Sequence, residues 1–126
     1  MKRSWIGFAL LMVLLLGGIF SSWLMVKIHE DVEQDLLQGA ECTALGDWDN
    51  GIRFFREAKN RWDRWKGFRA CFADHGPTEE IDAGFSALEV YGWAREDIPF
   101  TAQCCALAKQ VAAVGQAHKL SWENLF

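Results

Sequence analysis

The residues best placed to do chemistry gather around His75. Four carboxylates lie close to it in the sequence: Asp74, Glu79, Glu80 and Asp82. An imidazole among carboxylates is able to bind a metal ion or to move protons. The same pattern also starts a helix, because Pro77 suits a first helical turn and carboxylates there interact favourably with the helix dipole. We therefore favour a helix start, and keep a metal or acid–base enzyme at the His75 corner as the weaker alternative. We predict no catalytic residue, no metal ligand and no cofactor.

Residues 53–72 form a basic and aromatic segment. The segment carries seven Lys or Arg residues against two acidic ones, and six Phe or Trp side chains are interspersed among them. Such a face suits anionic lipid or an anionic cell-wall polymer, but a solvated helix face opposite an apolar core has the same composition. Residues 28–126 hold all 17 acidic residues and ten of the 13 basic ones, a formal charge of −7. Nucleic acid is therefore not expected as a partner.

The four cysteines show no metal-binding pattern, because neither a CxxC pair nor a zinc-finger spacing of Cys and His is present. Free Cys is often a small buried residue on a helix, and we favour that reading. A disulfide is permitted outside the cytoplasm. If one forms, we expect it to join Cys42 to Cys104 or Cys105, with Cys71 at the opposite end of the domain.

An uncharged run from Trp5 to Val26 organises the chain. At 1.5 Å per residue this run reaches about 33 Å, enough to cross a hydrocarbon core of roughly 30 Å. A cleaved signal sequence is the alternative, but the run is longer than a usual apolar signal core and lacks a small-x-small cleavage site at its end. We predict a single-pass anchor in the cell membrane, residues 1–27, with Trp5 and Trp23 at the two interfaces.

The charges that flank the run predict its orientation. Lys2 and Arg3 precede it, whereas residues 28–35 carry four acidic residues and no Lys or Arg. Positive charge stays on the cytoplasmic side, so the N-terminus is expected in the cytoplasm and residues 28–126 outside the cell membrane.

Apolar spacing predicts an all-α domain. Residues recurring every three or four positions indicate that the anchor helix continues to about Leu45 and that a second long helix begins at Trp48. Arg69 falls on the apolar face of that helix, so we expect the helix to have frayed by residue 69 or the Arg69 side chain to snorkel out. Further helices are expected over 78–94 and 97–115, followed by a docked tail. No segment alternates with period two, so no sheet is expected. The short connections predict two antiparallel hairpins, which together make four helices.

Counting residues places parts of this domain at the bilayer. The stalk after the anchor has 18 residues and climbs about 27 Å, and the next helix descends by the same amount. It brings these residues to headgroup level: Arg64, Trp65, Lys66, Phe68, Arg69 and Phe72. The last helix returns Lys119, Trp122 and Phe126 to the same plane. Aromatic and cationic side chains suit that interface.

The order of these features resembles a family of small single-pass proteins of Gram-positive bacteria that is classed as a domain of unknown function. The features are a basic N-terminus, one span, an acidic stalk, a Gly46-Asp47-Trp48 turn, a Trp-rich second helix, an Asp74-His75 corner and an Asn124-Leu125-Phe126 ending. The resemblance implies a membrane-anchored helical domain without an assigned activity, and it assigns no catalytic or binding residue.

We therefore expect a membrane-tethered interaction or scaffolding module on the outer face of the cytoplasmic membrane, with membrane lipid and a protein as partners. The alternative is a binder of anionic lipid or cell-wall polymer through segment 53–72. Salt-sensitive binding to anionic liposomes favours the alternative, salt-insensitive capture of one protein favours the module, and bound metal favours the enzyme.

Overall fold

The computed structural model describes residues 1–72 and 75–125, with side chains described for all of these except 72, 75 and 120–125. It contains five helices: α1 (Lys2–Ala44), α2 (Trp48–Arg64), α3 (Lys66–Phe72), α4 (His75–Ala94) and α5 (Asp97–Leu125). No strand occurs in the described part of the chain. The predicted all-α class is confirmed.

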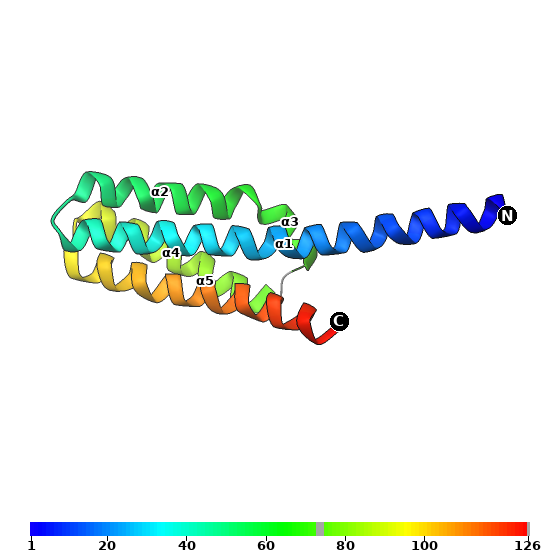
Figure 1. Cartoon of the computed structure of the whole chain (residues 1–126). Coiled ribbons are helices and arrows are strands. Elements are labelled where there is room, and N and C mark those ends of the chain that lie inside the picture. Colours follow the sequence, from blue (N-terminus) through cyan, green and yellow to red (C-terminus); the bar gives the residue numbers. More distant parts are fainter. Residues whose placement is uncertain (73–74, 126) are drawn as a thin grey trace.

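Helix α1 is continuous from the apolar run into the folded domain, as the apolar spacing predicted. Its first half projects alone from the other helices, and its second half lies among them (Figure 1). Side chains up to Phe20 are almost all exposed, and burial begins at Met25 and Ile28. Within the described residues, α1 is the one helix that is long and apolar enough to cross a membrane by its length and composition.

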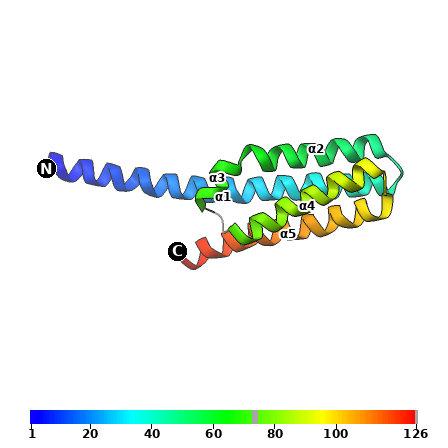
Figure 2. The same cartoon turned by 180° about the vertical axis from the view of Figure 1, so that it is seen from behind.

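The turn between α1 and α2 forms where the sequence predicts it. Gly46 adopts a φ of +82°, a left-handed conformation that glycine tolerates without strain. Asp47 caps α2, because its Oδ1 accepts a hydrogen bond from the backbone N–H of Asn50 at 3.3 Å. The two helices then lie side by side in both views (Figures 1 and 2).

Two helix ends differ from the prediction. The helix that begins at Trp48 ends at Arg64, before Arg69 as one of the two expectations had it, but a further short helix, α3, begins at Lys66, and the Arg69 side chain is buried rather than snorkelling out. The break lets the Arg69 side chain turn back and donate a hydrogen bond to the carbonyl of Trp62. Helix α5 does not end near Gly115 but continues to Leu125. Gly115 marks a close approach instead, since a β-carbon there would lie 2.9 Å from Cβ of His29.

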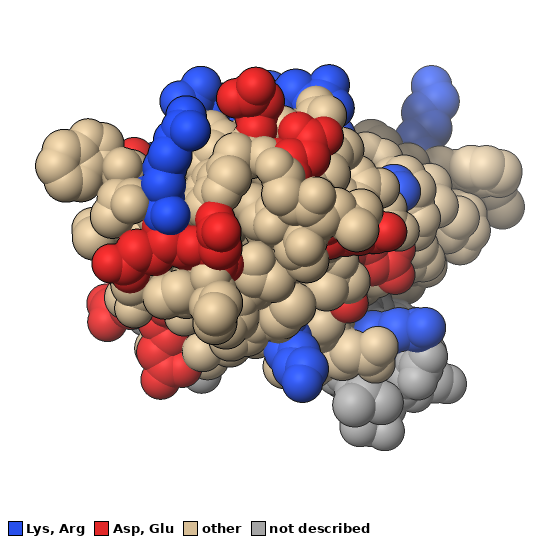
Figure 3. Space-filling model, turned by 90° about the vertical axis from the view of Figure 1, so that its left-hand side faces the viewer, with Lys and Arg blue, Asp and Glu red and all other residues tan. Residues whose placement is uncertain are grey.

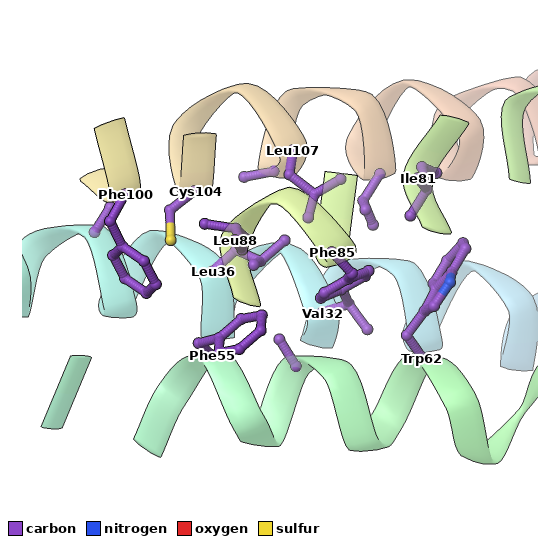
Figure 4. Packing of buried hydrophobic residues seen from close by; sticks show 14 residues of the cluster. Val32, Leu36, Phe55, Trp62, Ile81, Phe85, Leu88, Phe100, Cys104 and Leu107 are labelled. Carbon is purple, nitrogen blue, oxygen red and sulfur yellow. The ribbon is translucent and has the colours of Figure 1, made fainter. Parts of the chain in front are cut away.

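The core is one cluster to which four helices contribute (Figure 4). Helix α1 packs mainly against α5 and α2, and α4 packs against α5. Aromatic rings join α2 to α4: the centroids of Phe55 and Phe85 are 6.3 Å apart, and those of Trp62 and Phe85 are 6.1 Å apart. Trp62 therefore belongs to the core and lies on the side of it that faces the end of the domain from which α1 projects.

Candidate functional site

Polar side chains converge on Trp62 at the end of the domain from which α1 projects. We call His29, Trp62, Arg69, Asp82 and His118 the Trp62 cluster. The indole N–H donates to Oδ1 of Asp82 at 2.6 Å, which ties α2 to α4. The His29 ring meets the indole edge-on, with centroids 5.6 Å apart, and the His118 ring lies 6.0 Å from that of His29. Helices α1 to α5 thus each supply one member.

The His29 ring is buried and is held by a hydrogen bond to the backbone of its own helix. Its side chain is 1% exposed, and Nδ1 donates to the Met25 carbonyl at 2.7 Å. Nε2 then carries the lone pair, and it has no hydrogen-bond partner. Burial lowers the pKa of His29, with smaller lowering contributions from His118 and Arg69, and the Met25 bond opposes them. Burial also lowers the pKa of His118.

Arg69 is a buried cation on α3. Its side chain is 1% exposed, and its guanidinium carbon lies 3.4 Å from the centroid of the Trp62 ring. Nη2 donates to the Trp62 carbonyl, whereas Nε and Nη1 have no partner. Among the described residues no carboxylate forms an ion pair with it. Burial lowers the pKa of Arg69, and the more distant Asp82 and Asp63 oppose that shift.

The basic aromatic segment is divided among three places rather than forming one face. Arg53, Arg56 and Lys59 line a groove of about 790 Å³ between α2 and α4, together with Trp93. Arg61 pairs with α1, because its Nε lies 2.9 Å from Oδ2 of Asp35. The basic and aromatic side chains of this segment therefore do not lie together on one surface.

The remainder of the segment leads to α3. Arg64 and Lys66 are exposed, and Trp65 and Phe68 are half-buried and contact each other with centroids 6.0 Å apart. Arg69 points inward over Trp62, so its charge lies inside the domain. The headgroup contacts expected for these residues stay predictions.

The opposite end of the domain exposes large apolar side chains that the sequence analysis did not single out. We call Leu45, Trp93 and Ile98 the apolar tip; their side chains are 79%, 90% and 82% exposed. They flank the α1–α2 and α4–α5 turns. Figure 3 looks onto this end, where uncharged residues cover much of the surface and charged side chains lie around and between them. A cavity of about 430 Å³ beside Ile98 and Cys105 adjoins the tip.

All four cysteines are free thiols in this structure. Cys104 is buried in the core, and burial raises the pKa of its thiol to about 12. Cys42 and Cys105 are half-buried and Cys71 is exposed. The disulfide from Cys42 to Cys104 or Cys105 stays a prediction.

Other predicted site residues are placed as follows. Trp5 and Trp23 are exposed on the projecting part of α1, and the ring of Trp23 lies 6.2 Å from that of Phe20. Lys119 is exposed on α5. The side chains of Phe72, His75, Trp122 and Phe126 lie outside the described residues. In the described part of the chain, no three His, Cys, Asp or Glu side chains are grouped as a metal site.

Sequence reasoning missed His29 and His118 as site residues. His29 belongs to no catalytic motif, and the 89 positions that separate it from His118 hide their proximity. Gly115 is the residue from which this contact could have been predicted, because an isolated glycine within a helical pattern often marks a close packing contact.

Comparison of the chain with models of protein families, with curated proteins and with solved structures found no match in any of the three. The resemblance to a single-pass family therefore stays a prediction, and the function has to be argued from the geometry alone.

Proposed function

We propose that the chain is a membrane-tethered interaction module whose helical domain binds a protein partner outside the cytoplasmic membrane. In this proposal residues 5–26 cross the membrane and the rest forms an antiparallel four-helix domain of two hairpins. Turns of three and two residues, 45–47 and 95–96, support the hairpins, because short connections place consecutive helices antiparallel.

The burial of α1 supports an anchor. Only 6% of its most apolar stretch is buried, so this stretch does not act as the core helix of its own domain. It is also continuous with the helix that supplies Val32 and Leu36 to the core. Lys2 and Arg3 on one side, and the acidic residues after Lys27 on the other, support a cytoplasmic N-terminus.

The apolar tip is the observation that carries the proposal. Three large apolar side chains are more than three-quarters exposed at this one end of the domain, and Trp is enriched among the residues that dominate binding energy. The tip lies at the end of the domain away from the anchor: Ala44 follows Val26 by 18 positions, or about 27 Å along the helix. A partner there is a protein rather than the bilayer that holds the anchor.

Site-specific photocrosslinking in cells tests this proposal. A photoreactive amino acid at position 93 should give one dominant crosslinked protein, whereas the same amino acid at exposed Lys109, on α5, should not. Trp93→Ala combined with Ile98→Ser should abolish capture by a pulldown of the full-length protein, and Lys109→Ala combined with Gln110→Ala should leave it unchanged. Equal capture by the two double variants would remove the tip as the binding surface.

A binder of anionic lipid is a second candidate, supported by the exposed cations Arg64 and Lys66 near the end from which α1 projects. Each cation near an anionic bilayer surface gains about 1 kcal/mol. The crosslink formed from position 93 distinguishes the two candidates. If the tip substitutions leave it unchanged and the double variant Arg64→Gln, Lys66→Gln abolishes it, the lipid-binding candidate is favoured over the protein-binding tip.

A further inference from the structure

The groove between α2 and α4 is an open surface beside the apolar tip. It has a volume of about 790 Å³ and is lined by residues of the range 48–60 on α2 and of the range 89–95 at the end of α4. Trp93 belongs both to the groove and to the apolar tip. Farther along α4 the two helices meet in the core, where the ring centroids of Phe55 and Phe85 are 6.3 Å apart. The groove is therefore a surface above a closed core.

The groove contains an apolar part with an exposed aromatic side chain beside it. Ile52 of α2 lies against α4, since a β-carbon on Gly92 would lie 3.0 Å from its Cδ1 atom. The neighbouring Trp93 side chain is 90% exposed. Trp is enriched among the residues that dominate binding energy at interfaces. The chain thus presents a groove and, next to it, a large apolar side chain that its own fold leaves uncovered.

Charges of both signs surround this apolar part. Four basic residues line the groove: Arg53, Arg56, Lys59 and Arg95. Three acidic residues line it as well: Asp49, Glu57 and Glu89. Figure 3 shows basic and acidic side chains next to each other at this end of the domain. A balanced surface of this kind disfavours a polyanion as the occupant and suits a surface that itself carries both signs.

The two helices that form the groove differ in charge. Helix α2 carries five Lys or Arg residues against three acidic ones, whereas α4 carries four acidic residues and no Lys or Arg. Among the described side chains no ion pair joins α2 to α4. Arg56 and Glu89 are both exposed, one on each helix. Their charges are therefore accessible to groups outside the chain.

Helices α2 and α4 run in opposite directions along the groove. Ile52, near the start of α2, lies against Gly92, near the end of α4. Trp62, near the end of α2, contacts Phe85 instead, with ring centroids 6.1 Å apart. A residue later in α2 is therefore level with a residue earlier in α4.

This direction places an apolar pair and a charged pair at successive levels of the groove. Arg56 follows Ile52 by four positions and lies on the same face of α2. Glu89 precedes Trp93 by four positions and lies on the same face of α4. Ile52 and Trp93 thus share one level, and Arg56 and Glu89 share the next.

We propose that a second copy of the chain occupies this groove, with Trp93 of each copy in the groove of the other. This names the partner at the Trp93 side of the apolar tip and rests on the proposed function. Two copies anchored in one membrane have the same orientation, so a twofold axis along the membrane normal relates them. Such an axis keeps every residue at its own height. Trp93 of one copy therefore meets Ile52 of the other, and Arg56 of one meets Glu89 of the other.

Exchanging two exposed charges tests the proposal. Each contact occurs twice in a twofold dimer. Arg56→Glu would place two glutamates together in both contacts, and Glu89→Arg would place two arginines together, so neither variant should pair with itself. A mixture of the two variants should pair, because each contact then joins Glu to Arg. Both residues are exposed and neither forms an ion pair within the described chain, so each variant should retain the melting temperature of the parent.

The measurement uses full-length protein in dodecyl maltoside micelles. Sedimentation equilibrium gives the mass of each species, and two different affinity tags report pairing in the mixture. We expect each single variant to raise the dissociation constant of the dimer at least about tenfold. Lys109→Glu, at an exposed position on α5, should leave the dimer unchanged. A monomeric parent, a single variant that pairs as tightly as the parent, or a mixture that does not pair would overturn the proposal.

Photocrosslinking in cells separates the failure of this inference from the failure of the proposed function. A photoreactive amino acid at position 93 should give a product of twice the mass of the chain, composed of two copies. A product with one different protein would overturn the second copy as the partner and retain the interaction module. The absence of any product would overturn both.

Discussion

A β-carbon on Gly51 would lie 2.5 Å from Cγ2 of Thr43, because α1 and α2 are in close contact at these two residues. Gly39 completes the contact, since a β-carbon there would lie 3.3 Å from the carbonyl oxygen of Gly51. Gly51→Ala should therefore lower the free energy of unfolding by about 1–3 kcal/mol through overpacking. Chemical denaturation of the detergent-solubilised protein measures this loss.

The Thr43 side chain offers a control for this prediction. Thr43→Ser removes the methyl group but retains the hydroxyl, which donates to the Gly39 carbonyl at 3.1 Å and contacts the Thr101 hydroxyl at 2.8 Å. In a Thr43→Ser background Gly51→Ala should cost much less than in the parent. An unchanged cost would show that the methyl group does not limit the approach of α2.

Gly115→Ala should also destabilise the protein, for the same physical reason at a different interface. Its new β-carbon would lie 2.9 Å from Cβ of His29, an atom close to the backbone that cannot move away by changing rotamer. A loss of about 1–3 kcal/mol is expected. Gly67→Ala is the matched control, because nothing lies within 4 Å of its β-carbon position. That change should be neutral or stabilising by up to about 1 kcal/mol. Equal effects in thermal melts of the two variants would contradict the contact between α1 and α5.

Local signals in the sequence account for much of the fold. The Gly46–Asp47 turn follows from a glycine able to adopt positive φ and an aspartate able to cap a helix, and both act within a few residues. The position of the break in α2 does not follow from such signals. Apolar periodicity continues past Trp65, and Arg69 on the apolar face indicates only that the helix ends before residue 69. The contact of Arg69 with Trp62 accompanies the break in the folded chain and cannot be read from spacing.

The candidate sites were harder to predict from the sequence, because they too depend on contacts between residues that are distant along the chain. His29 and His118 meet because α1 and α5 pack along their length, and no spacing within either helix records that contact. The apolar tip was missed because its three residues lie in or beside turns. Helical periodicity does not distinguish a buried from an exposed apolar residue at a helix end.

Acidic pH should destabilise the domain. The folded pKa of His29 lies below the ordinary value of 6.5, because burial disfavours the charged ring. Below pH 6.5 the unfolded chain binds a proton at His29 that the folded chain does not. The contribution of His29 to the free energy of unfolding is therefore fully present above pH 6.5 and is lost as the pH falls from 6.5 towards the folded pKa. His118 contributes in the same direction.

Melting temperatures between about pH 8 and about pH 5 measure this dependence. The double variant His29→Gln, His118→Gln should flatten the profile. Asp35 does not produce the same slope: burial raises its pKa, so its contribution decreases as the pH rises through the folded pKa. A slope that survives in the double variant would assign the pH dependence to other groups.

Thiol reactivity should differ sharply among the cysteines. Cys104 is fully buried and burial raises its pKa to about 12, so almost no reactive thiolate exists at neutral pH. Cys71 is exposed. Mass spectrometry after brief alkylation of the folded protein should find Cys71 modified and Cys104 protected. Labelling of both at the same rate would contradict the packing of α5 against the core.

Disulfide mapping of protein purified without reductant extends this prediction. If the domain is oxidised outside the cytoplasm, the bond should join Cys42 to Cys104 or Cys105 on the neighbouring α5. A bridge within one chain from Cys71 to any of the other three would contradict the arrangement of hairpins, because Cys71 lies on α3 at the far end of α2 from the α1–α2 turn.

The proposed anchor predicts a gradient of depth along the domain. A fluorescent amino acid at exposed Ala70 on α3 should be quenched by a lipid-phase quencher in proteoliposomes, whereas one at Asp47 in the distal turn should not. The expected difference follows from about 27 Å of helix between Val26 and Ala44. A third probe at Leu16 inside the apolar run is the positive control, and it should be quenched more than either. Equal quenching at 70 and 47 with strong quenching at 16 would keep the span but show that α3 does not reach the bilayer. In that case Arg64 and Lys66 are merely solvated, and the lipid-binding candidate fails while the apolar tip is unaffected.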